Sequence, residues 1–175
     1  MIPALLPAKE LSTILEEARL QSWISGHATQ RTGSLEELRT QLDRQKTQTS
    51  SRTHKKVEST YWGIQVDASK DQCIGVDLEY LSQTFIKRDL QTMQELLELP
   101  EESSHQDILV EWTSREAAYK ALRQSSDAPL AELAQLKRVD KEPTSFVLGP
   151  QNVSCHVKTA IENNWILSIA KLETL

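Results

Sequence analysis

The segment that most constrains the fold is residues 74–79, which read IGVDLE. An apolar run with one glycine leads into two acids, Asp77 and Glu79, separated by a single residue. Alternate side chains of a β-strand lie on one face of the sheet, so these two carboxylates are expected to lie side by side. Like charges at a buried strand cost free energy unless a cation or a hydrogen-bond donor compensates them. We therefore expect the fold to bring such a partner to this strand.

The composition is that of a soluble globular protein. The chain has 175 residues, of which 38% are hydrophobic and 26% charged, enough to form a core without disulfides. The formal net charge of −5 argues against bulk nucleic-acid binding as the main activity. The sequence contains no apolar run of about 18 residues that would predict a membrane span, and its first residues lack the features of a signal peptide. We therefore expect a cytoplasmic protein in which Cys73 and Cys155 are reduced.

Hydrophobic periodicity predicts an α+β fold with a mostly antiparallel sheet packed by helices. Helices are expected over 8–20, from a Ser34–Glu37 capping box to about 42, over 84–98 and over 106–124. Strands are expected over 61–68 and 73–79, paired as an antiparallel hairpin. Four more are expected after them: one that begins near Leu136, then SFVLG, VSCHVKTAI and WILSIAKL, with Asn163 and Asn164 as the last turn. Residues 25–34 and most of 43–60 are expected to form loops, because they are polar and lack periodicity.

One face of the helix predicted over 106–124 carries Trp112, Glu116 and Lys120 at intervals of four residues. In isolation this pattern is typical of a surface ion pair. Together with Asp77 and Glu79, however, it offers three carboxylates from two elements, and carboxylate oxygens are the ligands that magnesium prefers. Lys120 would lie where it could neutralise a phosphate beside that metal. The combination indicates phosphoryl-type transfer, in which catalysis is mostly positioning and charge stabilisation.

The segments IGVDLE and EWTSREAAYKAL resemble, in order and spacing, the two-part signature of 4′-phosphopantetheinyl transferases. The matching residues are Gly75, Val76, Asp77, Leu78, Glu79, Trp112, Thr113, Glu116, Ala117 and Lys120. The signature lies in the middle of the chain, which is similar to the larger, surfactin-synthetase-activating type of the family. The resemblance therefore implies that family's fold with pseudo-two-fold lobes. Residues 1–68 would form a short, divergent N-terminal lobe, and residues 69–175 a C-terminal lobe that carries the metal site.

The resemblance implies a magnesium-dependent transferase. Such an enzyme transfers the 4′-phosphopantetheine arm of coenzyme A to a serine of an acyl or peptidyl carrier protein and releases adenosine 3′,5′-bisphosphate. Asp77, Glu79 and Glu116 would be the metal ligands, Glu116 would also accept the serine proton, and Lys120 would contact the coenzyme A phosphates. This activity serves fatty acid, polyketide or nonribosomal peptide biosynthesis. Two lobes in one chain favour a monomer. We expect no nucleic-acid or membrane partner.

Two departures from the family pattern affect the coenzyme A contacts. Arg115 stands where the signature usually has a lysine, and its charge makes it a candidate contact. The segment VESTYW, residues 57–62, replaces the family's serine–histidine segment, so Ser59 or Thr60 is expected to take that place.

The N-terminal lobe is also short, and it lacks the family's G-K-P segment. Lys55 and Lys56, or Arg52, are candidates for a coenzyme A phosphate on charge alone. The basic stretch from 44 to 56 is also open to two other interpretations, a solvated loop or a contact with the acidic carrier protein. The short lobe also supports an alternative function, in which the chain is a catalytically impaired family member that binds a carrier protein or another partner.

Overall fold

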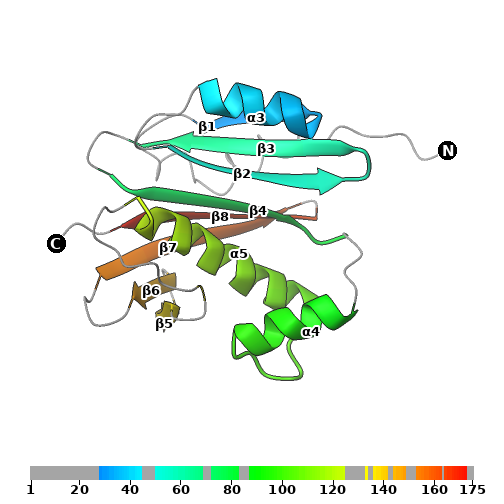
Figure 1. Ribbon diagram of the computed structural model, residues 1–175. Helices are drawn as coiled ribbons and strands as arrows, with labels where there is room; N and C mark the ends of the chain where they lie inside the picture. Colours follow the sequence, from blue (N-terminus) through cyan, green and yellow to red (C-terminus); the bar gives the residue numbers. More distant parts are fainter. Residues whose placement is uncertain are drawn as a thin grey trace.

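The computed structural model describes residues 28–44, 50–68, 72–82, 87–124, 133, 136–141, 144–148, 153–162 and 164–172. Within these residues the chain forms two antiparallel sheets with helices on their outer faces, stacked in layers (Figure 1). This arrangement confirms the predicted α+β class. The helix predicted over 8–20 lies outside the described residues.

The first sheet has the strand order β1-β3-β2 and is antiparallel throughout. Its strands are β1 (Ala28–Gly33), β2 (Ser50–Val57) and β3 (Thr60–Asp67). The prediction of loops over 25–34 and 43–60 is therefore wrong for both β1 and β2. The sequence of β2 obscures its strand character, because the side chains that it buries at Ser51 and Thr53 are hydroxyls and not apolar groups.

Helix α3 (Leu35–Arg44) covers the outer face of the first sheet (Figure 1). Its N-terminus has the predicted capping box. The Ser34 backbone N–H donates to Glu37 Oε2 at 2.8 Å, and the Glu37 N–H donates to Ser34 Oγ at 3.3 Å. Leu38 is almost fully buried and anchors the helix.

The second sheet has the strand order β4-β8-β7-β6-β5 and is also antiparallel. Its strands are β4 (Ile74–Tyr80), β5 (Leu136–Lys141), β6 (Thr144–Leu148), β7 (Val153–Glu162) and β8 (Trp165–Leu172). Glu162 pairs with Trp165, and Asn164 has a φ of 68°, which Asn tolerates better than most residues. These findings confirm the predicted C-terminal strands and the turn that joins β7 to β8.

The predicted hairpin between 61–68 and 73–79 is wrong. β3 pairs with β1 and β2, whereas β4 pairs with β8, so the two segments belong to different sheets. Their apolar faces pack against each other in the main core. The core is formed by Trp62, Ile64, Val66, Ile74, Val76, Leu78, Trp165, Leu167 and Ile169. Two adjacent apolar strands can bury their side chains either by pairing edge to edge in one sheet or by stacking face to face, and here they stack.

Two helices accompany the second sheet, as predicted. α4 (Lys87–Leu96) precedes α5 (His105–Leu122), whose N-terminus is closed by a capping box between Ser104 and Asp107. α5 packs on the face of the sheet opposite the main core, over Cys155, Val157 and Ala170. None of the described helices is long and apolar enough to cross a membrane.

Gly75 allows α5 to approach β4 very closely. A Cβ atom at this position would lie 1.8 Å from the carbonyl oxygen of Ala117 and 2.7 Å from the backbone nitrogen of Ala121. Only a residue without a side chain fits between the strand and the helix backbone. Asp77 follows Gly75 by two residues on the same face of β4. The close contact at Gly75 therefore brings the carboxylates of this strand near to α5, the helix that contains Glu116.

Candidate functional site

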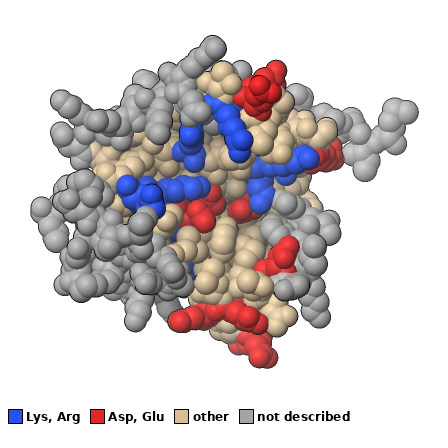
Figure 2. Space-filling view, viewed as in Figure 1, with Lys and Arg blue, Asp and Glu red and all other residues tan. Residues whose placement is uncertain are grey.

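The structure brings the two predicted segments together in one pocket of about 380 Å³. The pocket is lined by Arg52, Thr53 and His54 of β2, Asp77 and Glu79 of β4, and Trp112, Glu116 and Lys120 of α5. Figure 2 shows Lys and Arg side chains around a smaller acidic area near the middle of this face. The site therefore combines a small group of carboxylates with a surrounding set of cations.

Asp77 is held through one of its two carboxylate oxygens. Thr53 Oγ1 donates to Asp77 Oδ1 at 2.9 Å, and Lys120 Nζ donates to the same oxygen at 2.6 Å. The Asp77 side chain is only 8% exposed. Its second oxygen, Oδ2, is buried and accepts no hydrogen bond from the described residues. A buried acceptor without a partner is costly, so this oxygen is suited to a cation.

Lys120 joins the helix to the strand. Besides Asp77, its ammonium donates to the carbonyl oxygen of Val76 at 3.2 Å and lies 3.9 Å from Glu116 Oε2. The Lys120 side chain is 29% exposed, more than the Asp77 side chain beneath it. Lys120 therefore compensates the charge of Asp77 from the more open side of the site.

Glu79 and Glu116 both lie in environments that disfavour their charged forms. Burial raises the pKa of Glu79, and the ion pair with Lys55 partly opposes this shift. Burial likewise raises the pKa of Glu116, against the attraction of the Lys120 ammonium. A carboxylate with a raised pKa accepts a proton more readily near neutral pH.

These residues fit a hard divalent cation. Asp77, Glu79 and Glu116 offer oxygen donors from two elements, and the orphaned Asp77 Oδ2 has unused acceptor capacity. In the part of the chain that the structure describes, no three His, Cys, Asp or Glu side chains lie close enough to form a preformed metal cluster. Instead, Lys120 and Lys55 compensate Asp77 and Glu79. A cation would take over part of this compensation.

The raised pKa values make stability depend on pH. Between the usual pKa of 4.5 and their raised values, Glu79 and Glu116 bind more protons in the native state than in the unfolded state. The free energy of unfolding should therefore fall as pH rises through this window, as urea titrations can measure. Glu116→Gln should make the fall shallower. Glu37→Gln should change the pH dependence mainly below pH 4.5, because hydrogen bonds from Ser34 lower the pKa of Glu37. If the free energy of unfolding depends on pH equally steeply in the wild type and in Glu116→Gln, the pKa of Glu116 is not raised in the native state.

Side-chain hydrogen bonds hold β2 against the free edge of β4. Ser51 Oγ accepts a hydrogen bond from the Val76 backbone N–H at 2.9 Å. Gln124 extends the link, because it accepts from the Ile74 N–H and donates to the carbonyl oxygen of Ser50, both at 3.0 Å. β4 is an edge strand of the second sheet, and these contacts satisfy backbone groups that an edge would leave open.

Arg115 is directed into the protein interior. It is 8% exposed; its Nε donates to Glu111 Oε1 at 2.8 Å, and its guanidinium also donates to the carbonyl oxygen of Leu97 at 3.0 Å. Glu111 also receives a hydrogen bond from Arg138. Arg115 thus ties α5 to the end of α4 and is not among the residues that line the pocket, and its contact with coenzyme A stays a prediction.

Lys55, Lys56, Ser59 and Thr60, the other predicted coenzyme A contacts, do not line the pocket. Lys55 pairs with Glu79, and Lys56 lies over the ring of Tyr61, 5.7 Å from its centre. Ser59 is in the turn between β2 and β3, and Thr60 begins β3. Their contacts with coenzyme A also stay predictions.

Two pocket residues of β2 were not predicted for the site, Thr53 and His54, whereas Arg52 was a candidate on charge alone. Burial, and then the nearby cations led by Arg39, lower the pKa of His54, so its neutral form is favoured. Residues 50–57 alternate between buried and more exposed positions, but the buried residues are Ser51 and Thr53, so no apolar alternation in the sequence could have placed this segment on a strand.

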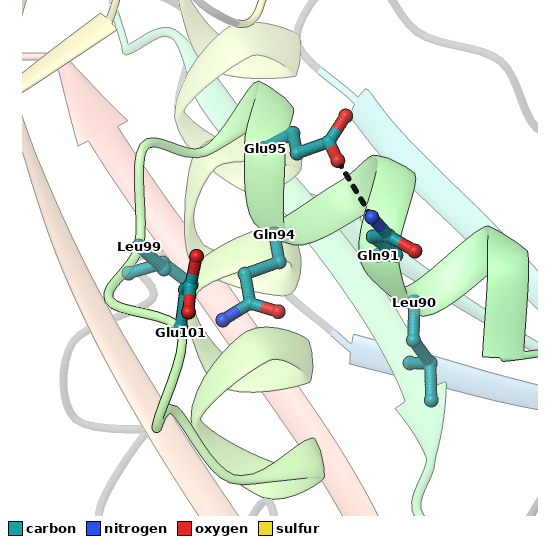
Figure 3. A pocket seen from close by; sticks show the side chains of 6 residues that line it. All are labelled: Leu90, Gln91, Gln94, Glu95, Leu99 and Glu101. Atoms are coloured by element: carbon teal, nitrogen blue, oxygen red, sulfur yellow. Dashed lines mark hydrogen bonds between the residues drawn. The ribbon is translucent and has the colours of Figure 1, made fainter.

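A second pocket, of about 450 Å³, lies on α4 and the segment that follows it (Figure 3). It is lined by Leu90, Gln91, Gln94, Glu95, Leu99 and Glu101. Gln91 donates a hydrogen bond to Glu95 at 3.0 Å across one helical turn. None of the residues predicted for the functional site lines this pocket, so the candidate site is the pocket at β4 and α5.

Comparison with known proteins adds no relative to this picture. A scan against models of known protein families finds no match, and a search of curated proteins finds none either.

Proposed function

We propose that this chain is a 4′-phosphopantetheinyl transferase of the two-lobed type, which modifies a serine of an acyl or peptidyl carrier protein in the cytoplasm. The observation that carries the proposal is the meeting of Asp77, Glu79, Glu116 and Lys120, from two separate motifs, in one pocket. Two sheets, each with a helix on its outer face, are also consistent with two related lobes. The predicted boundary between residues 68 and 69 falls between β3 and β4.

The carboxylates would hold the magnesium ion that the proposed reaction requires. Asp77 would bind it through Oδ2, and Glu79 and Glu116 would complete the protein donors. When bound, magnesium would supply positive charge beside the pyrophosphate of coenzyme A and offset the charge that develops on the leaving adenosine 3′,5′-bisphosphate. The two acids of the IGVDLE segment would then serve to place a cation beside a diphosphate.

Glu116 and Lys120 would act on the two reacting partners. Glu116 would accept the proton of the carrier serine as the serine oxygen attacks the β-phosphorus of coenzyme A; its raised pKa suits it to this task. Lys120 would move its ammonium from Asp77 towards the phosphate oxygens. The basic side chains in and beside the pocket, among them Arg52 and Lys55, would attract the diphosphate and the acidic surface of a carrier.

The proposal predicts transfer activity that mass spectrometry can measure directly. The protein is incubated with coenzyme A, Mg²⁺ and a panel of apo carrier proteins, and we expect one or more carriers to gain the mass of a phosphopantetheine group. Omission of Mg²⁺ should prevent the gain. Circular dichroism and a urea titration establish that the protein is folded.

The result also separates the transferase from a binding module. Absence of any mass gain from folded protein, together with calorimetric binding of a carrier but not of coenzyme A, would favour the catalytically impaired alternative. Mass gain on a carrier that depends on Mg²⁺ would exclude that alternative.

A further inference from the structure

The hydroxyl of Thr53 donates a hydrogen bond to Asp77, one of the carboxylates that line the pocket. Thr53 lies on β2, is 6% exposed, and its Oγ1 donates to Asp77 Oδ1 at 2.9 Å. The two residues are 24 positions apart in the sequence and belong to different sheets. A side chain of the first sheet therefore binds directly to β4, the strand of the second sheet that contains IGVDLE.

The contact distinguishes the two oxygens of the Asp77 carboxylate. Thr53 and Lys120 both donate to Oδ1, while Oδ2 is buried without a hydrogen-bond donor among the described residues. A carboxylate that is fixed on one oxygen cannot rotate freely, so its other oxygen keeps one direction. Outer hydrogen bonds to metal ligands orient them in this way, and their loss typically weakens metal binding.

We propose that Thr53 is a positioning residue that holds Asp77 by Oδ1 and leaves Oδ2 to bind a divalent cation. This inference rests on the proposed function, because it concerns the same site. It assigns a role in that site to the first lobe: β2 fixes the orientation of a carboxylate whose strand belongs to the second lobe. Lys120 shares Oδ1 but is more exposed, so it can leave when a phosphate arrives, whereas Thr53 stays in place.

Ser51 provides a matched comparison on the same strand. It lies two residues before Thr53, faces the same side of β2, and is 5% exposed. Its hydroxyl also contacts β4, but the partner is the Val76 backbone N–H and not a carboxylate. Loss of either hydroxyl loosens β2 against β4, whereas only loss of the Thr53 hydroxyl should release Asp77.

The test measures binding of Mn²⁺ alone, without coenzyme A, from the electron paramagnetic resonance signal of the free ion. Thr53→Val removes the hydroxyl and nearly keeps the shape, so it should weaken Mn²⁺ binding about 10- to 100-fold. Thr53→Ser retains the hydroxyl and should bind close to the wild-type value, and Ser51→Ala should bind as the wild type does. Urea titrations of all variants report folding, and Thr53→Ala replaces Thr53→Val if the latter does not fold.

Each contrary result has a distinct meaning. Wild-type affinity in Thr53→Val overturns the positioning role and leaves the proposed function intact, because the cation still binds. Equal losses in Thr53→Val and Ser51→Ala also overturn it, since the effect would then be general loosening of β2. Absence of Mn²⁺ binding in folded wild type overturns the inference at its base, and the carrier transfer assay then decides independently on the function.

Discussion

Replacement of Asp77 by Asn is expected to reduce phosphopantetheine transfer about 10²- to 10³-fold, the loss typical when one preorganised electrostatic partner is removed from an active site. The substitution keeps the shape of the side chain and removes its charge. It takes one oxygen donor from the cation and the counter-ion from Lys120, which lies 2.6 Å from Asp77 Oδ1. The initial rate of carrier modification at saturating Mg²⁺ measures the effect, and Mn²⁺ affinity should fall in parallel.

Asp67→Asn is the matched control for this variant. Asp67 also lies on a strand and binds a neighbouring side chain, because Gln65 Nε2 donates to its Oδ1 at 2.9 Å. It does not line the pocket, so its replacement should leave the transfer rate unchanged. If Asp77→Asn folds and transfers at the wild-type rate, Asp77 is not a metal ligand and the proposed mechanism fails.

The sequence predicted the elements whose apolar residues follow a regular period. β4, α4, α5 and the hairpin of β7 and β8 were all expected, because their buried side chains are apolar and their ends carry recognisable caps or turns. β2 was missed for a physical reason. The inner side chains of β2, Ser51 and Thr53, are buried against a backbone N–H and a carboxylate of β4, and such partners cannot be read from β2 itself.

The pairing of strands was the second failure. β3 and β4 are consecutive and both strongly apolar, and this pattern is satisfied by a hairpin or by two stacked sheets. What decides between them is the set of partners elsewhere in the chain, β1 and β2 for β3 and β8 for β4. Periodicity within one segment contains no information about those partners.

The candidate site was predicted in part. The spacing of Asp77 and Glu79 on a strand and of Glu116 and Lys120 on a helix indicated which side chains share a face, and the structure places all four in one pocket. The contribution of β2 could not be predicted, because it depends on the packing of one sheet edge against another. Thr53 became a candidate only through its bond to Asp77.

Replacement of Gly75 by Ala should affect stability more than any other single change considered. The added methyl carbon would lie 1.8 Å from the Ala117 carbonyl oxygen and 2.7 Å from the Ala121 nitrogen, and both are backbone atoms of α5 that cannot rotate away. The helix must then move off β4, which opens the core on that face. We expect the free energy of unfolding to fall by about 3 kcal/mol or more, at the upper end for overpacked cores. Urea denaturation followed by circular dichroism measures it.

Gly33→Ala is the comparison that isolates this cause. The methyl carbon added there would lie 2.8 Å from the carboxylate end of the flexible Glu37 side chain, and the φ of 159° adds some backbone strain. The cost should therefore be about 1 to 2 kcal/mol, smaller than at Gly75. Equal losses in the two variants would mean that the contact with α5 is not the reason for Gly75. If Gly75→Ala still folds, its transfer rate should fall as well, because Asp77 and Lys120 meet only while the helix rests on the strand. Gly75 would then be required for the packing of α5 on β4, and Asp77 and Glu79 for binding the cation.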